Sequence, residues 1–313
     1  MSPDSAAPRC YAGPVDLLRR AIKSDFSLRV VAAVTTGLVS DACARHGLRG
    51  VEAVALGRAL TAGCLLTTLT KTEAERLRLE LRGSGPLRGL LVDARGDGTV
   101  RGCLQRHLAA DEHARLSVGT GRLTVAPALG VRGSLVVTRD LGLEQRYQGT
   151  VEVVSGEVDR DIEHYLNASE QLPSVLACEV MLDHHDRVQR AAGVLVQTFP
   201  GGDEAELDQL RGVIAAGNLG DLLRQDRSCE ELIGFALAGE AYDDMGATSL
   251  QFRCTCGPER ARTVVSTLGA DDIEALANEQ SQTEIRCEYC GAVYSLSAEQ
   301  LRALAADIRR ERS

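Results

Sequence analysis

Hydrophobic and polar residues follow two different periods along the chain, and each period predicts a different element. Leu77, Leu79 and Leu81 alternate with charged residues, which is the two-residue period of a half-buried strand. Glu52 to Leu69 carries apolar residues at helical spacing and is predicted to be a buried helix. Both kinds of segment recur in the first two-thirds of the sequence.

The same patterns predict further strands and one further helix. Extended segments are expected at 16–35, 87–94, 99–105, 133–140, 144–155, 174–183 and 191–199, and a helix at 158–168. The sequence Arg-Gly-Asp-Gly at 95–98 favours a hairpin turn between two of these strands. A mixture of this kind indicates an α+β core domain over residues 1–200.

The composition changes after the predicted core. From Gly201 to Ala247 the sequence holds eleven acidic residues and three arginines, a net charge of −8 in a chain whose total is −9. Its apolar residues form short amphipathic groups interrupted by glycines. Helices this short are marginal in isolation. Residues 201–247 are therefore predicted to be a metastable helical linker, with an ordinary solvated connector as the alternative.

Four of the ten cysteines lie in two tight pairs near the C-terminus. Cys254 and Cys256 form a Cys-x-Cys pair, Cys287 and Cys290 form a Cys-x-x-Cys pair, and thirty residues separate the pairs. Four thiolates supplied in this way suit the tetrahedral geometry of zinc, and none of the six histidines has ligand spacing with them. Residues 248–313 are therefore predicted to be a small domain that binds one zinc ion through these four cysteines.

Each cysteine pair is followed directly by a glycine, Gly257 or Gly291. A tight turn at these glycines would let backbone N–H groups point at the sulfurs. A disulfide within Cys-x-Cys closes a small, strained ring, which makes the bond labile and suits a reversible switch. A permanent structural zinc ribbon remains the alternative on spacing alone.

Several segments resemble, in the same order, those of a known protein family. They are Leu81–Leu87, Arg146–Gly149, Ser169–Pro173, Phe252–Cys256 and Ile285–Gly291. Together they resemble the bacterial redox-regulated holdase chaperones, the 33-kDa heat-shock protein family. The resemblance extends over most of the chain.

The resemblance implies an ATP-independent chaperone that binds unfolding proteins during oxidative stress. It implies a reduced, zinc-bound and inactive form in which the linker folds on the core. In the oxidised, active form zinc is released, and Cys254 is joined to Cys256 and Cys287 to Cys290. The closeness of each pair in the chain favours the same disulfides. Unfolded proteins are the expected partners, and a homodimer is expected in the oxidised state.

Other features of the sequence bear on location and partners. Met1 to Pro14 has no apolar segment, and the chain has no run of eighteen apolar residues, so neither a secretory signal nor a membrane span is predicted. Cysteines scattered without a pairing pattern fit a reducing compartment, which predicts a cytoplasmic protein. A net charge of −9 disfavours a nucleic-acid surface.

No catalytic constellation stands out, and the chain is predicted not to be an enzyme. Pro86 interrupts the glycine-rich segment 83–89, which therefore does not predict a dinucleotide loop. Cys178 and His184 have no sequence context for a nucleophile and its base. Cys178 is instead interpreted as a small hydrophobic residue, as are Cys43, Cys64 and Cys103. Cys229 lies in the linker and is a candidate for additional disulfides.

Two other functions remain open at this point. One is a zinc-ribbon nucleic-acid-binding protein, supported only by Arg302, Arg309, Arg310 and Arg312 near the C-terminus. The other is a cytosolic thiol-disulfide oxidoreductase that uses Cys287 and Cys290 as its redox couple.

Overall fold

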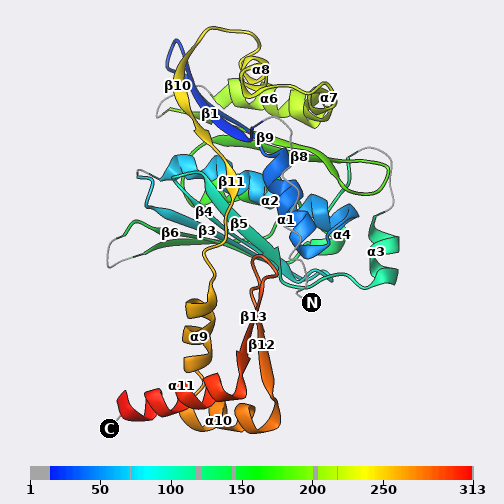
Figure 1. The fold of residues 1–313 in the computed structure, drawn as a ribbon. Helices are drawn as coiled ribbons and strands as arrows, with labels where there is room; N and C mark the ends of the chain where they lie inside the picture. The colour runs from blue at the N-terminus through cyan, green and yellow to red at the C-terminus, as the bar shows by residue number, and fades with distance from the viewer. Residues whose placement is uncertain are drawn as a thin grey trace. The chain divides into compact units, whose positions relative to one another are not determined.

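A five-stranded sheet, one buried helix and a six-stranded sheet lie in three layers in the first part of the chain (Figure 1). The computed structural model describes residues 15–70, 72–117, 122–142, 146–199, 204–216 and 218–311. The chain divides into two compact units, Met1–Arg253 and Cys254–Ser313, and each is described by itself. The prediction for Met1 to Pro14 lies outside the described residues.

The five-stranded sheet, called sheet A, has the order β10-β1-β2-β9-β8, and each neighbouring pair is antiparallel. Its strands are β1 (Leu17–Lys23), β2 (Leu28–Val34), β8 (Ser174–Leu182), β9 (Val188–Thr198) and β10 (Tyr242–Ser249). The extended segments predicted at 16–35, 174–183 and 191–199 are therefore confirmed.

The six-stranded sheet, called sheet B, has the order β11-β5-β4-β3-β6-β7. Its strands are β3 (Arg76–Gly83), β4 (Gly89–Arg95), β5 (Thr99–Leu104), β6 (Gly133–Asp140), β7 (Tyr147–Glu152) and β11 (Gln251–Phe252). Leu77, Leu79 and Leu81 of β3 are at most 1% exposed, as their alternation predicts. The predicted hairpin is formed by β4 and β5.

Helix α2 (Gly50–Leu66) fills the space between the two sheets, and every one of its residues is buried. Glycines allow the close approach: an added Cβ at Gly57 would lie 2.7 Å from Val39, and one at Gly63 would lie 2.8 Å from Val92. With the short helix η1 (Thr67–Leu69), it is the one helical segment of the described chain long and apolar enough to cross a membrane. Because it is entirely buried, we interpret it as the predicted core helix.

The remaining core helices are α1 (Thr36–His46), α3 (Ala110–Leu116), α4 (Ala126–Leu129) and α5 (Val158–Ala168). Helix α5, predicted from the sequence, protects the free edge of sheet A at β8. Its side chains Asp159, Glu163 and Asn167 accept hydrogen bonds from backbone N–H groups of β8. These bonds satisfy strand donors that would otherwise be open to another chain.

Three short helices cover the face of sheet A that points away from α2 (Figure 1). They are α6 (Glu204–Ala215), α7 (Asn218–Arg224) and α8 (Cys229–Ala236), and we call them the linker helices. Their apolar residues, among them Leu207, Leu219 and Leu232, form one core with the outward-facing residues of β1, β2, β8 and β9. The predicted short amphipathic helices are present and bury their apolar sides on the sheet.

The end of the linker differs from the prediction. Residues 242–249, partly assigned to a helical linker, form strand β10, which pairs with β1 at the edge of sheet A. Residues 248–253, assigned to the zinc domain, lie in the first compact unit, and β11 pairs in parallel with β5. The difference arises because β10 is held by backbone pairing while most of its side chains are exposed, so the sequence carries no apolar alternation. The predicted core end near Pro200 lies outside the described residues.

The second unit contains α9 (Pro258–Ser266), α10 (Ala270–Glu279), β12 (Gln282–Arg286), β13 (Val293–Ser297) and α11 (Ala298–Glu311). Strands β12 and β13 form an antiparallel pair. A small core of its own contains Val265, Ile273, Leu296, Leu301 and Ile308. A unit this small has little hydrophobic stabilisation to rely on.

A single lysine holds acidic residues of the linker against the core. The Lys23 ammonium lies 3.0 Å from Glu240, 3.1 Å from Glu206 and 3.1 Å from Asp25. The Lys23 side chain is 8% exposed, whereas the side chains of the three acidic residues are 38–60% exposed. Hydrogen bonds to Glu240 and Glu206 raise the pKa of Lys23 well above its usual value. Part of the linker's negative charge is therefore neutralised by docking.

We expect Lys23→Met to weaken docking of the linker helices and leave the core folded. The substitution leaves three carboxylates close together without their cation, and their partial solvation limits the loss to about 1–2 kcal/mol. Hydrogen exchange of residues 204–240 should become faster, while exchange in α2 should not change.

Arg115→Met is the matched control, because Arg115 pairs with Asp111 at an exposed position within the core helix α3. Equal exchange of residues 204–240 in the two variants would show that Lys23 does not hold the linker.

Candidate metal centre

The first cysteine pair lies directly after β11, in a segment between β11 and α9 without regular secondary structure. The N–H of Arg253 donates to the carbonyl of Val100 at 2.9 Å, so the backbone is attached to sheet B up to the residue before Cys254. Arg260 of α9 donates to the hydroxyl of Thr255 at 2.9 Å and so reaches back to the segment between the two cysteines. Both sulfurs of this segment reach the same group of ligand atoms.

The second pair lies in the tight connection between β12 and β13. The N–H of Gly291 donates to the carbonyl of Cys287 at 2.8 Å, and the N–H of Cys287 donates to the carbonyl of Ala292 at 2.8 Å. Gly291 has a φ of 70°, a left-handed conformation that glycine adopts easily, so the predicted turn is confirmed there. The prediction is wrong for Gly257, which is extended with a φ of −174° and precedes the first turn of α9.

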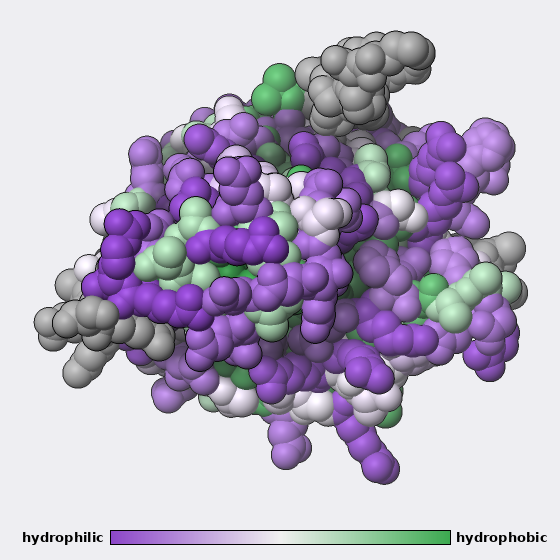
Figure 2. Space-filling view, turned by 60° about the horizontal axis from the view of Figure 1, so that its bottom comes forward, coloured by the Kyte–Doolittle hydropathy of each residue, from purple (hydrophilic) through white to green (hydrophobic). Residues whose placement is uncertain are grey.

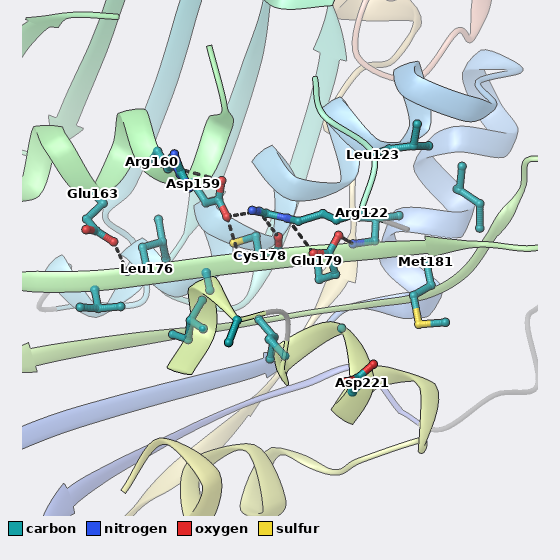
Figure 3. Close-up of a pocket in the computed structure, with 18 of the residues that line it drawn as sticks. Arg122, Leu123, Asp159, Arg160, Glu163, Leu176, Cys178, Glu179, Met181 and Asp221 are labelled. Atoms are coloured by element: carbon teal, nitrogen blue, oxygen red, sulfur yellow. Dashed lines mark hydrogen bonds and ion pairs between the residues drawn. The ribbon is translucent and has the colours of Figure 1, made fainter. Parts of the chain in front are cut away.

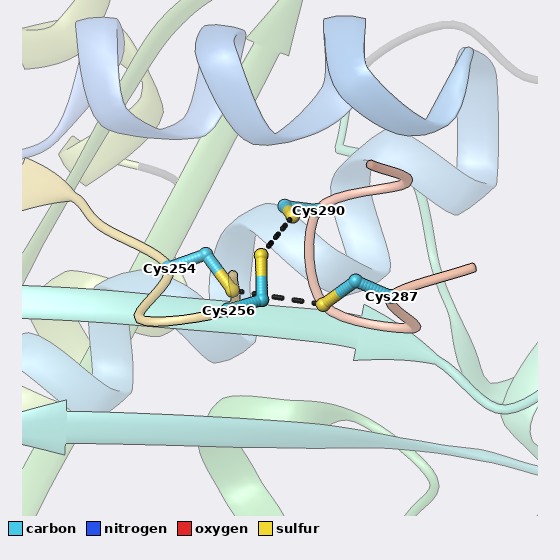
Figure 4. A group of neighbouring side chains, drawn as sticks. All are labelled: Cys254, Cys256, Cys287 and Cys290. Atoms are coloured by element: carbon cyan, nitrogen blue, oxygen red, sulfur yellow. Dashed lines mark hydrogen bonds between the residues drawn. The ribbon is translucent and has the colours of Figure 1, made fainter. Parts of the chain in front are cut away.

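The four sulfurs converge, with all ligand atoms within 4.8 Å of one another (Figure 4). The closest contacts join the two pairs: Cys254 Sγ lies 3.6 Å from Cys287 Sγ, and Cys256 Sγ lies 3.3 Å from Cys290 Sγ. Cys290 is buried with 7% exposed, and the other three cysteines are half-buried. In the part of the chain that the structure describes, this is the one such group of possible metal ligands.

The cluster has the donors and the size that a tetrahedral metal site needs. A zinc–sulfur bond of about 2.3 Å places the sulfurs of a tetrahedron roughly 3.8 Å apart. The separations in this cluster are close to that value and leave room for one ion at the centre. Four thiol ligands are soft donors, the kind that zinc accepts in closed sites. The cluster can therefore hold one metal ion, and zinc is the ion that its chemistry favours.

Two thiols of this cluster, those of Cys287 and Cys290, favour the protonated form when no cation is bound. Burial raises the pKa of the Cys287 thiol, and it raises that of the Cys290 thiol further. A divalent cation reverses this balance, because a coordinated thiol loses its proton. Metal binding should therefore release protons and weaken as the pH falls.

Tyr294 of β13 is the polar neighbour of the cluster that the sequence did not reveal. Its hydroxyl donates a hydrogen bond of 3.0 Å to Cys256 Sγ, and this bond raises the pKa of Tyr294 to about 12. A tyrosine four residues after Cys290 carries no recognisable signal in the sequence. The pairing of β12 with β13 fixes Tyr294 next to the second cysteine pair, and the convergence of the two pairs brings it to Cys256.

The other described cysteines are buried. For Cys43, Cys64, Cys103 and Cys178 of the core this agrees with the prediction of small hydrophobic residues. Cys229 of the linker, a candidate for additional disulfides, is also buried, and its thiol is free in this structure. Burial raises the pKa of Cys43 to about 12 and that of Cys229 to about 11. Cys178 is fully buried while His184 is exposed in the turn after β8, so the two do not form a nucleophile and its base. Cys10 lies outside the described residues.

A groove of about 1040 Å³ is lined by residues of β8, α5 and the linker helices α6 and α7 (Figure 3). Charged side chains on its core side pair with one another: Arg122 lies 2.5 Å from Asp159 and 2.8 Å from Glu179. Glu179 also accepts from the fully buried Arg58 at 2.9 Å. Groups paired in this way are a structural ion network, and they do not form a recognisable catalytic site.

Comparison with known proteins agrees with the fold and with the cysteine cluster. The family model described as "Hsp33 protein" matches residues 16–297. The chain belongs to the Hsp33 family. The predicted family is thus confirmed, and with it a chaperone function. Redox regulation also fits this family.

Individual members of the Hsp33 family match over nearly the whole chain. The 33 kDa chaperonin of Geobacter sulfurreducens is 37% identical over 290 residues, 92% of this chain and 94% of that protein. The 33 kDa chaperonin of Synechocystis is 37% identical over 313 residues, 95% of this chain and 98% of that protein. The crystal structure of the homologous protein from Thermotoga maritima has a TM-score of 0.82 at 27% identity, covering 94% of this chain and 99% of that one.

We expect Cys256→Ser to abolish stoichiometric metal binding and to loosen the second unit while the first stays folded. A hydroxyl cannot replace a thiolate in a closed zinc site, and structural zinc contributes an apparent ~10–16 kcal/mol in zinc-finger peptides. Metal analysis of protein purified without oxygen should give about one zinc per wild-type chain and far less for the variant.

Ser295→Ala, at an exposed position of β13 in the same unit, is the control and should keep a full equivalent. A wild-type protein that binds well below one equivalent would contradict the assignment of the metal centre.

Proposed function

We propose that this chain is a zinc-dependent, redox-regulated and ATP-independent holdase that binds unfolding proteins during oxidative stress. The observation that carries the proposal is the apolar outer face of sheet A, which in the described part of the chain is covered by the short linker helices. Val30, Ala32, Val175, Val194 and Val196 belong to that face and are at most 2% exposed. Uncovered, the face would form a broad apolar surface of the kind that binds other proteins.

With the linker helices docked, the apolar residues of this face are buried in one core with Leu207, Leu219 and Leu232. Figure 2 brings the bottom of the view in Figure 1 forward and so draws another face, which is mostly hydrophilic with its hydrophobic residues in small separate groups. Burial of the apolar face of sheet A supports an inactive state in which the linker helices are docked, and an active state in which they have left the sheet.

The linker helices have a low intrinsic stability. They contain 12, 7 and 8 residues, whereas isolated helices shorter than about 12–15 residues are marginal in water. Gly212, Gly220 and Gly234 lie within them, and an added Cβ at each would meet nothing within 4 Å. Packing therefore does not require these glycines, and each lowers helix stability by roughly 1 kcal/mol relative to alanine. The linker depends on its docking surface and on support at its ends.

At its C-terminal end the linker is supported by the chain segment that connects it to the metal centre. Strands β10 and β11 follow the linker helices, and Cys254 is the second residue after β11. Because most side chains of β10 are exposed, backbone bonds to β1 are its main attachment to the core. Release of the metal would unfold the small second unit, and these strands would then have no folded unit at their C-terminal end. We propose that this loosens β10 and then the linker.

For the oxidised state we propose disulfides between Cys254 and Cys256 and between Cys287 and Cys290. Sulfur distances alone do not select these bonds, because the closest contacts in the folded cluster join the two pairs. Closeness along the chain does favour them once the metal leaves and the second unit loosens. Each disulfide forms when two thiols transfer two electrons and two protons to hydrogen peroxide, which becomes two molecules of water.

The alternative functions gain little support. Arg309 pairs with Asp271 at 2.8 Å and with Glu274 at 2.6 Å, and Arg310 pairs with Asp307. These charges are compensated within the second unit, which weakens the argument for a nucleic-acid surface. Arg312 lies outside the described residues. A thiol oxidoreductase would need an accessible redox couple, whereas Cys287 and Cys290 belong to a four-sulfur cluster.

The proposal includes the partners and the location. Unfolding proteins are the ligands, the oxidised form associates into a homodimer through newly exposed apolar surface, and neither nucleic acid nor membrane takes part. The protein acts in the cytoplasm, without catalysis and without ATP. The three functional parts are a substrate-binding core, the linker and the zinc-binding switch.

Treatment of the zinc-loaded protein with hydrogen peroxide should release zinc and form the two proposed disulfides. Peptide mapping should find Cys254 linked to Cys256 and Cys287 linked to Cys290, and a reductant with added zinc should restore the starting state. A bond between Cys256 and Cys287 with zinc retained would contradict the switch.

The oxidised protein should suppress aggregation of a thermally unfolding client several-fold better than the reduced protein, in the absence of ATP. Light scattering of citrate synthase at elevated temperature measures this directly. The combined substitution of Gly212, Gly220 and Gly234 by alanine is the matched variant. By stabilising the linker helices, it should slow the gain of activity on oxidation without changing zinc release.

Equal protection by the reduced and oxidised wild-type proteins would exclude redox gating. Unchanged activation in the alanine variant, with helicity of the linker increased, would exclude the linker as the gate.

A further inference from the structure

The hydroxyl of Tyr294 is aimed at one of the four sulfurs. It donates to Cys256 Sγ at 3.0 Å, and Tyr294 is half-buried. Its backbone is fixed because β13 pairs with β12, where Tyr294 lies opposite Ile285. The donor therefore comes from the strand pair that also carries the second cysteine pair, while the acceptor belongs to the first. This hydrogen bond crosses the metal centre from one cysteine segment to the other.

We propose that Tyr294 is a positioning residue that restrains Cys256, so that the centre keeps its metal and reacts slowly with oxidants. The inference rests on the proposed function and adds a residue that sets the threshold of the switch. A hydrogen bond to a metal-bound thiolate withdraws electron density from the sulfur and makes it a weaker nucleophile. It also holds the sulfur in the orientation that the metal requires.

The reaction that Tyr294 slows is a nucleophilic one. The Cys256 thiolate attacks one oxygen of hydrogen peroxide, the O–O bond breaks, and a sulfenic acid and hydroxide form. A second thiolate then attacks the sulfenic sulfur and displaces hydroxide, which leaves a disulfide. Both steps remove charge from a ligand of the metal, so the metal is released. A hydrogen bond that occupies a lone pair of Cys256 opposes the first of these steps.

The neighbouring sulfur is protected differently. Cys290 Sγ lies 3.3 Å from Cys256 Sγ and belongs to a residue that is only 7% exposed. Burial limits the access of oxidants to Cys290, whereas Cys256 is half-buried and carries the hydrogen bond from Tyr294. Burial therefore slows oxidation of Cys290, and the hydrogen bond from Tyr294 slows oxidation of Cys256.

The test compares Tyr294→Phe with Thr283→Val in the reduced, zinc-loaded, full-length protein. Tyr294→Phe removes the hydroxyl and keeps the ring. Thr283→Val removes a buried hydroxyl from β12 of the same unit, and that hydroxyl has no hydrogen-bond partner among the described residues. At a fixed concentration of hydrogen peroxide, zinc release followed with a metal-binding dye should be about three- to tenfold faster in Tyr294→Phe than in the wild type. Thr283→Val should match the wild type.

A second readout separates this role from a merely structural one. Brief alkylation with iodoacetamide, resolved by mass spectrometry, should show modification of Cys256 rising relative to Cys287 in Tyr294→Phe. A general loosening of the unit would raise both together and leave their ratio unchanged. In the cobalt-substituted protein, loss of the hydrogen bond should move the sulfur-to-cobalt charge-transfer band to longer wavelength.

The outcomes are distinguishable. Wild-type protein that binds no zinc, or keeps it in peroxide, contradicts the proposed function itself. Suppose instead that the wild type releases zinc in peroxide. If Tyr294→Phe then releases zinc at the wild-type rate and has the wild-type alkylation ratio of Cys256 to Cys287, only the role of Tyr294 is overturned. If Tyr294→Phe does not hold a full equivalent of zinc, the wild type is prepared with 3-fluorotyrosine, whose more acidic phenol is a stronger donor. Zinc release should then be slower, and an equal or faster rate would overturn the inference.

Discussion

Sheet A is apolar on both faces, and the covering of these two faces organises the whole first unit. One face packs on α2, whose residues are all buried and which also supports sheet B. The other face packs on α6, α7 and α8. The first covering is a continuous helix inside the main core, and it cannot leave without unfolding the protein. The second is made of three short helices at the surface. The same sheet therefore has one cover inside the core and one at the surface, and we propose that the second leaves the sheet on oxidation.

The position of the cysteine cluster in the chain fits the proposed function. The cysteines lie directly after the strands that end the linker, so loss of a bound metal would act on the C-terminal end of the surface cover. Charge supports the docked state at other points: Arg19 pairs with Glu230 at 2.7 Å, and Arg211 pairs with Glu163 at 3.1 Å. Each such pair contributes little by itself at an exposed site. The linker is thus held by many weak contacts, and loss of one support can shift the balance.

The sequence predicts best those features that depend on neighbouring residues. The alternation of Leu77, Leu79 and Leu81, the buried helix before them and the paired cysteines were all found in this way. Strand β10 was missed because its register depends on pairing with β1, more than two hundred residues earlier, and its own side chains do not alternate. Gly257 and Gly291 have the same sequence context, yet only Gly291 lies between two paired strands that force a turn. Tyr294 was missed for the same reason, since its partner is brought close by tertiary contacts.

The topology of sheet A also has a consequence for biosynthesis. Strand β2 pairs with β9, and β1 pairs with β10, so the sheet joins the beginning of the chain to segments made much later. Helix α2 leaves the ribosome early, but the strands β8 and β9 that cover it begin only at Ser174 and Val188. At ~5–20 residues per second, an apolar helix waits on the order of ten seconds for its partners. While it is being made, the protein therefore carries the kind of exposed apolar segment that chaperones recognise.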